Sequence, residues 1–121
     1  MTARPDLAYK ILSQADWQLT LAEGRYDGSP VDQADGYIHL STEAQLPGTA
    51  ARHYAGQDSL MLVEVRLGDL GDDLVWEPSR GSDLFPHIYG PLPLRATGLA
   101  RPLSVTDDGR MILGDAAPRP A

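Results

Sequence analysis

Cysteine is absent from this 121-residue chain, so disulfides, thiolate nucleophiles and Cys-ligated zinc or iron–sulfur sites are excluded. Basic side chains are also few: 10 Lys and Arg stand against 17 Asp and Glu, a formal net charge of −7. Duplex nucleic acid would therefore be repelled. The longest uninterrupted apolar run, Leu60 to Val63, is too short to span a bilayer. The first residues lack the apolar segment of a signal peptide, so we expect a cytoplasmic protein that binds no membrane.

The composition that remains is typical of one globular domain, with 42% hydrophobic and 22% charged residues. We expect a single domain over residues 1–121, with a compact core at about 7–113. Residues 1–5 and 114–121 carry prolines without periodicity, which is typical of loose ends.

The first half of the chain shows alternating strand and helix signals. Apolar alternation predicts strands at 7–12 and 37–41. Ser13 has the chemistry of a helix N-cap and Gly24 that of a C-terminal stop, which predicts a helix between them. The segment 25–36 is rich in Gly, Pro and Asp and is predicted to be a loop. Thr42 to Gln45 matches a capping box, which predicts a second helix that continues to Gly56.

The second half is predicted to be mostly strands. Residues 59–67 are apolar on both alternating faces, which is typical of a central strand, and 74–77 form another strand. Three prolines in 86–93 predict a loop or an edge strand. Asp107-Asp-Gly109 between apolar runs predicts a hairpin. We therefore expect an α+β fold with two early helices packed on a mostly antiparallel sheet.

Several common active-site signatures are missing. The sequence holds no G-x-S-x-G elbow, no phosphate loop ending in Gly-Lys-Ser/Thr, no G-x-G-x-x-G and no H-E-x-x-H. The common hydrolases, nucleotide triphosphatases, Rossmann enzymes and zinc proteases therefore have no support.

His39 interrupts an otherwise apolar strand and is the first candidate functional residue. One interpretation is a half-buried histidine bonded to a backbone carbonyl. The other places it at a cleft beside a helix N-terminus, where Ser41 and Thr42 would help to bind a phosphate or carboxylate. Arg52, further along that helix, is a candidate to hold the same anion.

The second candidate region contains Trp76, Glu77 and the segment Phe85-Pro-His-Ile-Tyr-Gly-Pro-Leu92. Adjacent strand residues face opposite ways, so an indole in the core leaves the carboxylate solvated or directed into a site. The proline-rich segment is either a stiffened edge connection or a rigid loop that presents His87 and Tyr89 to a ligand. We expect no metal site, because no two histidines have the spacing typical of paired ligands.

Four motifs together resemble a small bacterial family known as a domain of unknown function, number 952 in that series. They are Trp17-x-x-x-Leu21-x-x-Gly24-x-Tyr26, Gly36-Tyr-Ile-His-Leu-Ser-Thr-x-x-Gln45, Trp76-Glu77 and the segment 85–92. The resemblance covers about residues 7–103. Members of this family look like the ADP-ribosyltransferase fold, a pair of packed, strongly curved sheets whose cleft binds NAD in true members.

The resemblance implies a cleft for NAD or a related nucleotide, in an ADP-ribosyl- or phosphotransferase-type enzyme or a degenerate one. The first-strand histidine of NAD-using relatives is missing, because Tyr9 and Lys10 stand there; Lys10 either replaces it as a donor or, as we expect, points outward. The alternative is a non-catalytic module that binds a small molecule or a protein on the same fold. The candidate catalytic residues are His39, His87 and Glu77, and the candidate ligand-binding residues are Tyr9, Ser41, Thr42, Arg52, Trp76 and Tyr89.

Overall fold

The computed structural model describes residues 5–79, 81 and 83–117. Its largest sheet has four antiparallel strands in the order β1-β4-β8-β9. These strands are β1 (Leu7–Ser13), β4 (Leu60–Arg66), β8 (Thr97–Val105) and β9 (Met111–Leu113). A three-stranded antiparallel sheet has the order β3-β6-β5, with β3 (Ile38–His39), β6 (Leu84–Ile88) and β5 (Leu74–Pro78). A short pair joins β2 (Arg25–Tyr26) to β7 (Leu92–Pro93).

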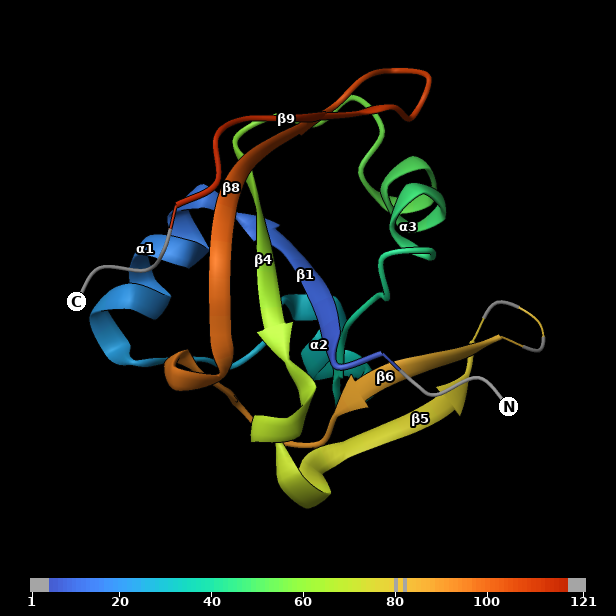
Figure 1. The fold of residues 1–121 in the computed structure, drawn as a ribbon. Coiled ribbons are helices and arrows are strands. Elements are labelled where there is room, and N and C mark those ends of the chain that lie inside the picture. Colours follow the sequence, from blue (N-terminus) through green and yellow to red (C-terminus); the bar gives the residue numbers. More distant parts are fainter. Residues whose placement is uncertain (1–4, 80, 82, 118–121) are drawn as a thin grey trace.

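Three α-helices are interleaved with the early strands among the described residues, so the fold is of the α+β class, as predicted. They are α1 (Gln14–Glu23), α2 (Pro30–Asp35) and α3 (Leu46–His53). The described connections also contain the 3₁₀ turns η1 (Leu67–Asp69), η2 (Gly71–Asp73) and η3 (Leu94–Ala96). Figure 1 shows α1 and α3 on opposite sides of the large sheet, with β5 and β6 below α3.

Strand β4 lies inside the large sheet, between β1 and β8, as its two apolar faces predicted. Val63 and Val65 are buried in the same cluster as Trp17 of α1. Leu60 and Leu62 point the other way, into a second cluster with Leu46 of α3. Side chains alternate across a strand, so β4 needs a helix on each face to keep both apolar rows from water.

The predicted helix α1 is confirmed at both ends. The Ser13 hydroxyl accepts a hydrogen bond from the backbone N–H of Asp16 at 3.0 Å, which satisfies one of the free amides of the first turn. Gly24 follows in the left-handed conformation, with φ of 82°, and donates its N–H to the carbonyl of Thr20. Glycine adopts this conformation without a Cβ clash, so the helix ends there.

The prediction that residues 25–36 form a loop is wrong. The segment contains β2 and the six-residue helix α2, which begins after Ser29. The Ser29 hydroxyl accepts from the N–H of Asp32, and the Asp32 carboxylate accepts from the N–H of Ser29, a complete capping box with Pro30 in the first turn. The capping hydrogen bonds therefore stabilise a short helix in a segment whose composition is typical of a loop.

The prediction of a loop or edge at residues 86–93 is wrong for 86–88, because β6 lies between β3 and β5, and it is confirmed for 89–93, which form an irregular connection and the strand β7 of a two-stranded pair. Pro86 is tolerated inside β6 for a geometric reason. It lies opposite Trp76 of β5, and on the other side its carbonyl accepts from the N–H of Leu40, just past the end of β3. Proline has no backbone N–H to donate, and this missing donor of Pro86 would face Leu40. Because Leu40 lies after the end of β3, no hydrogen bond between β3 and β6 is lost.

The second predicted helix begins later than expected. Thr42 and Gln45 do exchange the two reciprocal capping bonds, at 3.0 and 3.3 Å, but they close a turn, and α3 starts only at Leu46 and ends at His53. The predicted β8–β9 hairpin is confirmed around Gly109. Within the described part of the chain, no helix has the length and apolar composition needed to cross a membrane.

Candidate functional site

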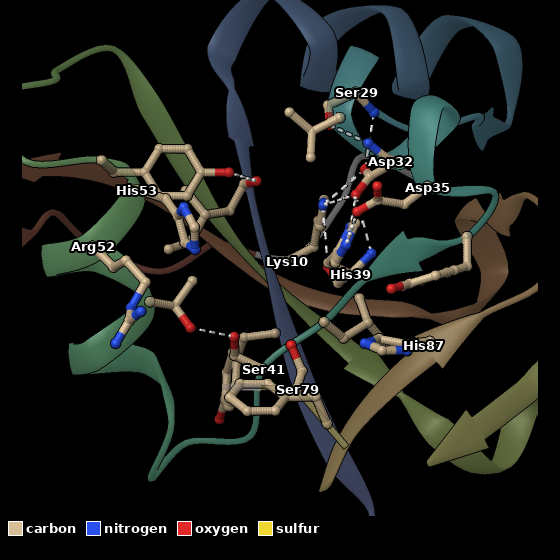
Figure 2. A pocket seen from close by; sticks show the side chains of 18 residues that line it. Lys10, Ser29, Asp32, Asp35, His39, Ser41, Arg52, His53, Ser79 and His87 are labelled. Atoms are coloured by element: carbon tan, nitrogen blue, oxygen red, sulfur yellow. Dashed lines mark hydrogen bonds and ion pairs between the residues drawn. The ribbon is translucent and has the colours of Figure 1, made fainter. Parts of the chain in front are cut away.

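A pocket of about 590 Å³ lies between α3 and the segment formed by α2 and β3. Figure 2 shows Arg52 and His53 of α3 on one side and Asp35 and His39 on the other, with the ribbon of β1 passing between them in this view. Lys10 of β1 also lines the pocket. The site is thus assembled from β1, from α2 and β3, from α3 and from β6.

The structure brings five of the nine candidate site residues to this pocket: Tyr9, His39, Ser41, Arg52 and His87. The four others are not in its lining. Thr42 closes the turn before α3, and Trp76 packs against the core cluster on the other face of its strand. Glu77 and Tyr89 lie behind His87 and contact it or each other.

His39 is held by the buried carboxylate of Asp32. Its Nδ1 lies 2.5 Å from Asp32 Oδ1, and its backbone N–H donates to the same oxygen at 3.1 Å. Burial by itself would raise the pKa of Asp32, but the hydrogen bonds from His39 and the charge of Lys10 outweigh it and hold that pKa well below its usual value. An ionised carboxylate only accepts, so Nδ1 of His39 carries the proton and the orientation of the ring is fixed.

Lys10 does not point outward, which corrects the expectation for this residue. It is 5% exposed, and its ammonium lies 2.9 and 3.1 Å from the two Asp32 oxygens and 3.0 Å from the carbonyl of His39. Burial lowers the pKa of Lys10, and the Asp32 charge offsets part of that effect. The three N–H donors of the ammonium face three oxygen acceptors, so Lys10 orients Asp32 and His39. An ammonium in this arrangement has no lone pair with which to act as a nucleophile.

Asp35, at the end of α2, completes this side of the pocket. Its Oδ2 lies 2.8 Å from Nε2 of His39, and its side chain is 46% exposed. The His39 ring is therefore flanked by two carboxylates, one buried and one at the surface. Both ring nitrogens face an acceptor in this arrangement.

His87 lies directly opposite His39 across the β3–β6 pair, so both side chains are on the same face of the sheet. The ring centroids are 5.5 Å apart, and Tyr37 stacks on His87 at 4.1 Å and tilts against His39 at 4.7 Å. Alternation along β3 places Tyr37, His39 and Ser41 on one face, and Ile38 and Leu40 in the core.

His87 is also backed by a carboxylate. Its Nδ1 lies 2.7 Å from Glu77 Oε1, and the Tyr89 hydroxyl donates to both Glu77 oxygens at 2.8 and 3.0 Å. Hydrogen bonds from His87 and Tyr89 lower the pKa of Glu77, and the same carboxylate raises the pKa of Tyr89. The His87 side chain is only 2% exposed, so Glu77 reaches the pocket through His87 rather than directly.

The opposite side of the pocket carries positive charge and hydroxyls. Arg52 and His53 come from the last turn of α3 and are exposed. Near them, the Ser41 and Thr49 hydroxyls are 2.8 Å apart. The N-terminus of α3, where an anion was expected, lines a different groove through Leu46 and Pro47. The part of α3 that lines the large pocket is therefore its C-terminal half, with Arg52 and His53 in the last turn.

Sequence reasoning missed Asp32, Asp35, the burial of Lys10 and the role of Tyr37. One local signal was available: Ser29 followed by Pro30 and by an acidic residue at position 32 is the pattern of a capped helix start. That pattern would have predicted α2, but not that Asp32 meets Lys10 from β1. Among residues 5–79, 81 and 83–117, no group of three or more His, Asp or Glu side chains is arranged to hold a metal ion.

The fold and the pocket define a small α+β protein with a histidine-containing pocket between α3 and the segment formed by α2 and β3. The chain belongs to the family described as protein of unknown function (DUF952), whose model matches residues 11–98. It is similar to the crystal structure of protein CC0527 from Caulobacter crescentus: 46% identity, 88% of this chain and 93% of that chain covered, and a TM-score of 0.82. The solution NMR structure of CC0527 is 47% identical, with 87% and 90% covered and a TM-score of 0.76. No curated protein matches the chain.

Proposed function

We propose that the pocket binds a nucleotide related to NAD, with the phosphates held by Arg52 and His53. The observation that supports this most directly is the division of the pocket, in which exposed Arg52 of α3 lies across from a histidine held by a carboxylate. Guanidinium groups bind phosphate oxygens in a two-point geometry, and the neighbouring hydroxyls of Ser41 and Thr49 add donors. The volume, about 590 Å³, is within the usual range for small-molecule sites.

His39 is the residue we propose as the general acid or base. The buried Asp32 fixes the ring, as the carboxylate does in other histidine-dependent sites, and Nε2 faces the pocket side where Asp35 lies. Breaking the bond between nicotinamide and ribose develops positive charge, which a nearby carboxylate stabilises. Asp35 is the exposed carboxylate of the lining, while Glu77 positions His87.

A non-catalytic binding module is the second candidate, and one observation favours it. Both nitrogens of His39 are engaged by carboxylates, and His87 is almost fully buried. His39 is not ready to accept a proton from a ligand unless Asp35 moves aside, and burial keeps His87 from direct contact with a ligand. A pocket of this kind serves recognition without chemistry equally well.

Calorimetric titration with ADP-ribose tests the binding proposal. The unaltered chain is expected to bind, and Arg52→Gln to bind roughly tenfold or more weakly, because a charge-assisted contact to phosphate is lost. Arg25→Gln is the matched control, since Arg25 is exposed and paired with Asp27 outside the pocket. Absence of binding at millimolar ADP-ribose, or equal loss in the two variants, would overturn the proposal.

Release of nicotinamide from NAD, followed by chromatography, separates the two candidates. An enzyme is expected to release nicotinamide over many turnovers and to lose that activity in His39→Gln. Binding of NAD without release, unchanged in His39→Gln, would identify the binding module instead.

A further inference from the structure

We infer that Asp35 is a specificity residue that keeps a second anionic group away from the His39 end of the pocket. The ligand would then place its phosphates at the α3 end of the pocket and ribose hydroxyls at the His39 end. This inference rests on the proposed function and deepens it, because it separates nucleotides with a free ribose from those with a phosphate on that ribose.

The two ends of the pocket differ in their available charge. At the α3 end, Arg52 makes no ion pair within the described part of the chain, and its guanidinium is exposed. Figure 2 shows Arg52 directed away from the cluster around Asp32 and Asp35. A phosphate at this end meets an accessible cation.

At the other end, the cationic groups are already engaged. The Lys10 ammonium donates to both oxygens of Asp32 and to the carbonyl of His39, so its three protons are used. The outward nitrogen of His39, the natural contact for an anion, faces Asp35 at 2.8 Å. A phosphate that entered here would meet the carboxylate of Asp35 with neither Lys10 nor His39 free to neutralise it.

Asp35 is not placed there to stabilise its helix. It is the last residue of α2, where the helix dipole is negative and a carboxylate is unfavourable. Its side chain is 46% exposed and accessible to a ligand. A carboxylate only accepts hydrogen bonds, and the two hydroxyls of a ribose are donors it would bind.

The test compares two ligands by calorimetry: ADP-ribose and ADP-ribose that carries one extra phosphate on the ribose distal to adenine. The unaltered chain is expected to prefer the first by roughly tenfold or more, because like charges oppose the second. Asp35→Asn keeps the shape and removes the charge, so the preference is expected to fall to roughly threefold or less, mainly through tighter binding of the phosphorylated ligand.

Two control variants make the outcome specific. Asp35→Glu keeps the negative charge and is expected to keep most of the discrimination. Asp27→Asn removes an exposed carboxylate outside the pocket and is expected to leave both affinities unchanged. Circular dichroism is expected to show Asp35→Asn folded, since the helix end loses an unfavourable charge and the side chain keeps its shape.

Contrary results of this titration distinguish the inference about Asp35 from the proposed function. Equal affinity of the two ligands for the unaltered chain would overturn this inference and leave the proposed function standing. Full discrimination in Asp35→Asn would also overturn it. Failure of both ligands to bind would overturn the proposed function itself.

Discussion

Asp32 is the residue on which the candidate site is built. Its carboxylate accepts hydrogen bonds from the Ser29 N–H, from Lys10, and from both the backbone and the ring of His39. Those partners come from the start of α2, from β1 and from β3, so one buried side chain fixes three segments relative to one another. Its own side chain is 3% exposed, which keeps water from competing for these bonds.

Lys10→Met is expected to lower the free energy of unfolding by about 3–5 kcal/mol, because it leaves the buried Asp32 without its counter-charge. Urea denaturation measures this loss. Arg25→Met is the matched control, since the Arg25–Asp27 pair is exposed at 63% and 52%, and is expected to cost under about 1 kcal/mol. Similar small costs for both variants would show that the Lys10–Asp32 pair does not anchor the site.

The stability of the protein is expected to fall in acid, with Asp32 as a contributor. The pKa of Asp32 is lowered in the folded state, so the unfolded chain binds more protons below about pH 4. The stabilisation is complete above the unfolded pKa and is lost as the pH falls toward the folded one. Urea denaturation from pH 7 to pH 3 is expected to show this decline, and a shallower one in Asp32→Asn. An unchanged slope in that variant would contradict the assignment.

Among the elements, α2 shows why part of the site was not predictable. Its six residues include two aspartates and have no apolar periodicity, so only its cap distinguishes it from a loop. In contrast, β1, α1, β4 and the β8–β9 hairpin were predicted because alternation, caps and the Asp-Gly turn are local signals. The burial of Lys10 depends on a partner 22 positions away, and no local pattern reports such a contact.

The pairing of β6 was missed for a related reason. The proline in β6 favoured the prediction of an edge strand. Pro86 fits inside the sheet only because β3 ends at the residue before the one opposite it. The length of a neighbouring strand is a property of the sheet and not of the proline-containing segment. The convergence of His39 and His87 follows from the same pairing, and the sequence motifs alone left it as a hypothesis.

The cap of α2 is expected to control the pocket as well as the helix. Ser29→Ala should cost about 1 kcal/mol, as should Ser13→Ala at the cap of α1, because each removes one side-chain acceptor for a free amide. Only Ser29→Ala is expected to shift the NMR signals of the His39 ring, through Asp32. Equal shifts of the His39 signals in the two variants, or no shift in Ser29→Ala, would contradict the expectation that the cap of α2 positions the His39 ring.

At the scale of the whole molecule, the two sides of the pocket depend on a shared core. β3 pairs with β6 in the His39–His87 register, and Ser41, two residues after β3, bridges to Tyr9 of β1. Leu40, next to His39 and 2% exposed, is buried in the core cluster that includes α1 and β4. Packing across this cluster fixes β3, and with it one side of the pocket, against the large sheet.

Leu40→Ala is therefore expected to lower the free energy of unfolding by about 2–5 kcal/mol, the sum of lost burial and a cavity. Leu19→Ala is the matched control, because Leu19 of α1 is 58% exposed and should change stability by about 0.5 kcal/mol or less. Thermal or urea unfolding compares them. A small cost at Leu40 would mean that β3 is not held by this core.

The most direct test of the account is a crystal structure of the protein with ADP-ribose. We expect the phosphates beside Arg52 and His53 of α3, and a ribose hydroxyl within hydrogen-bond distance of Asp35. Phosphates at the Asp35 and His39 end, or ligand found only in the groove lined by Leu46 and Pro47, would contradict it.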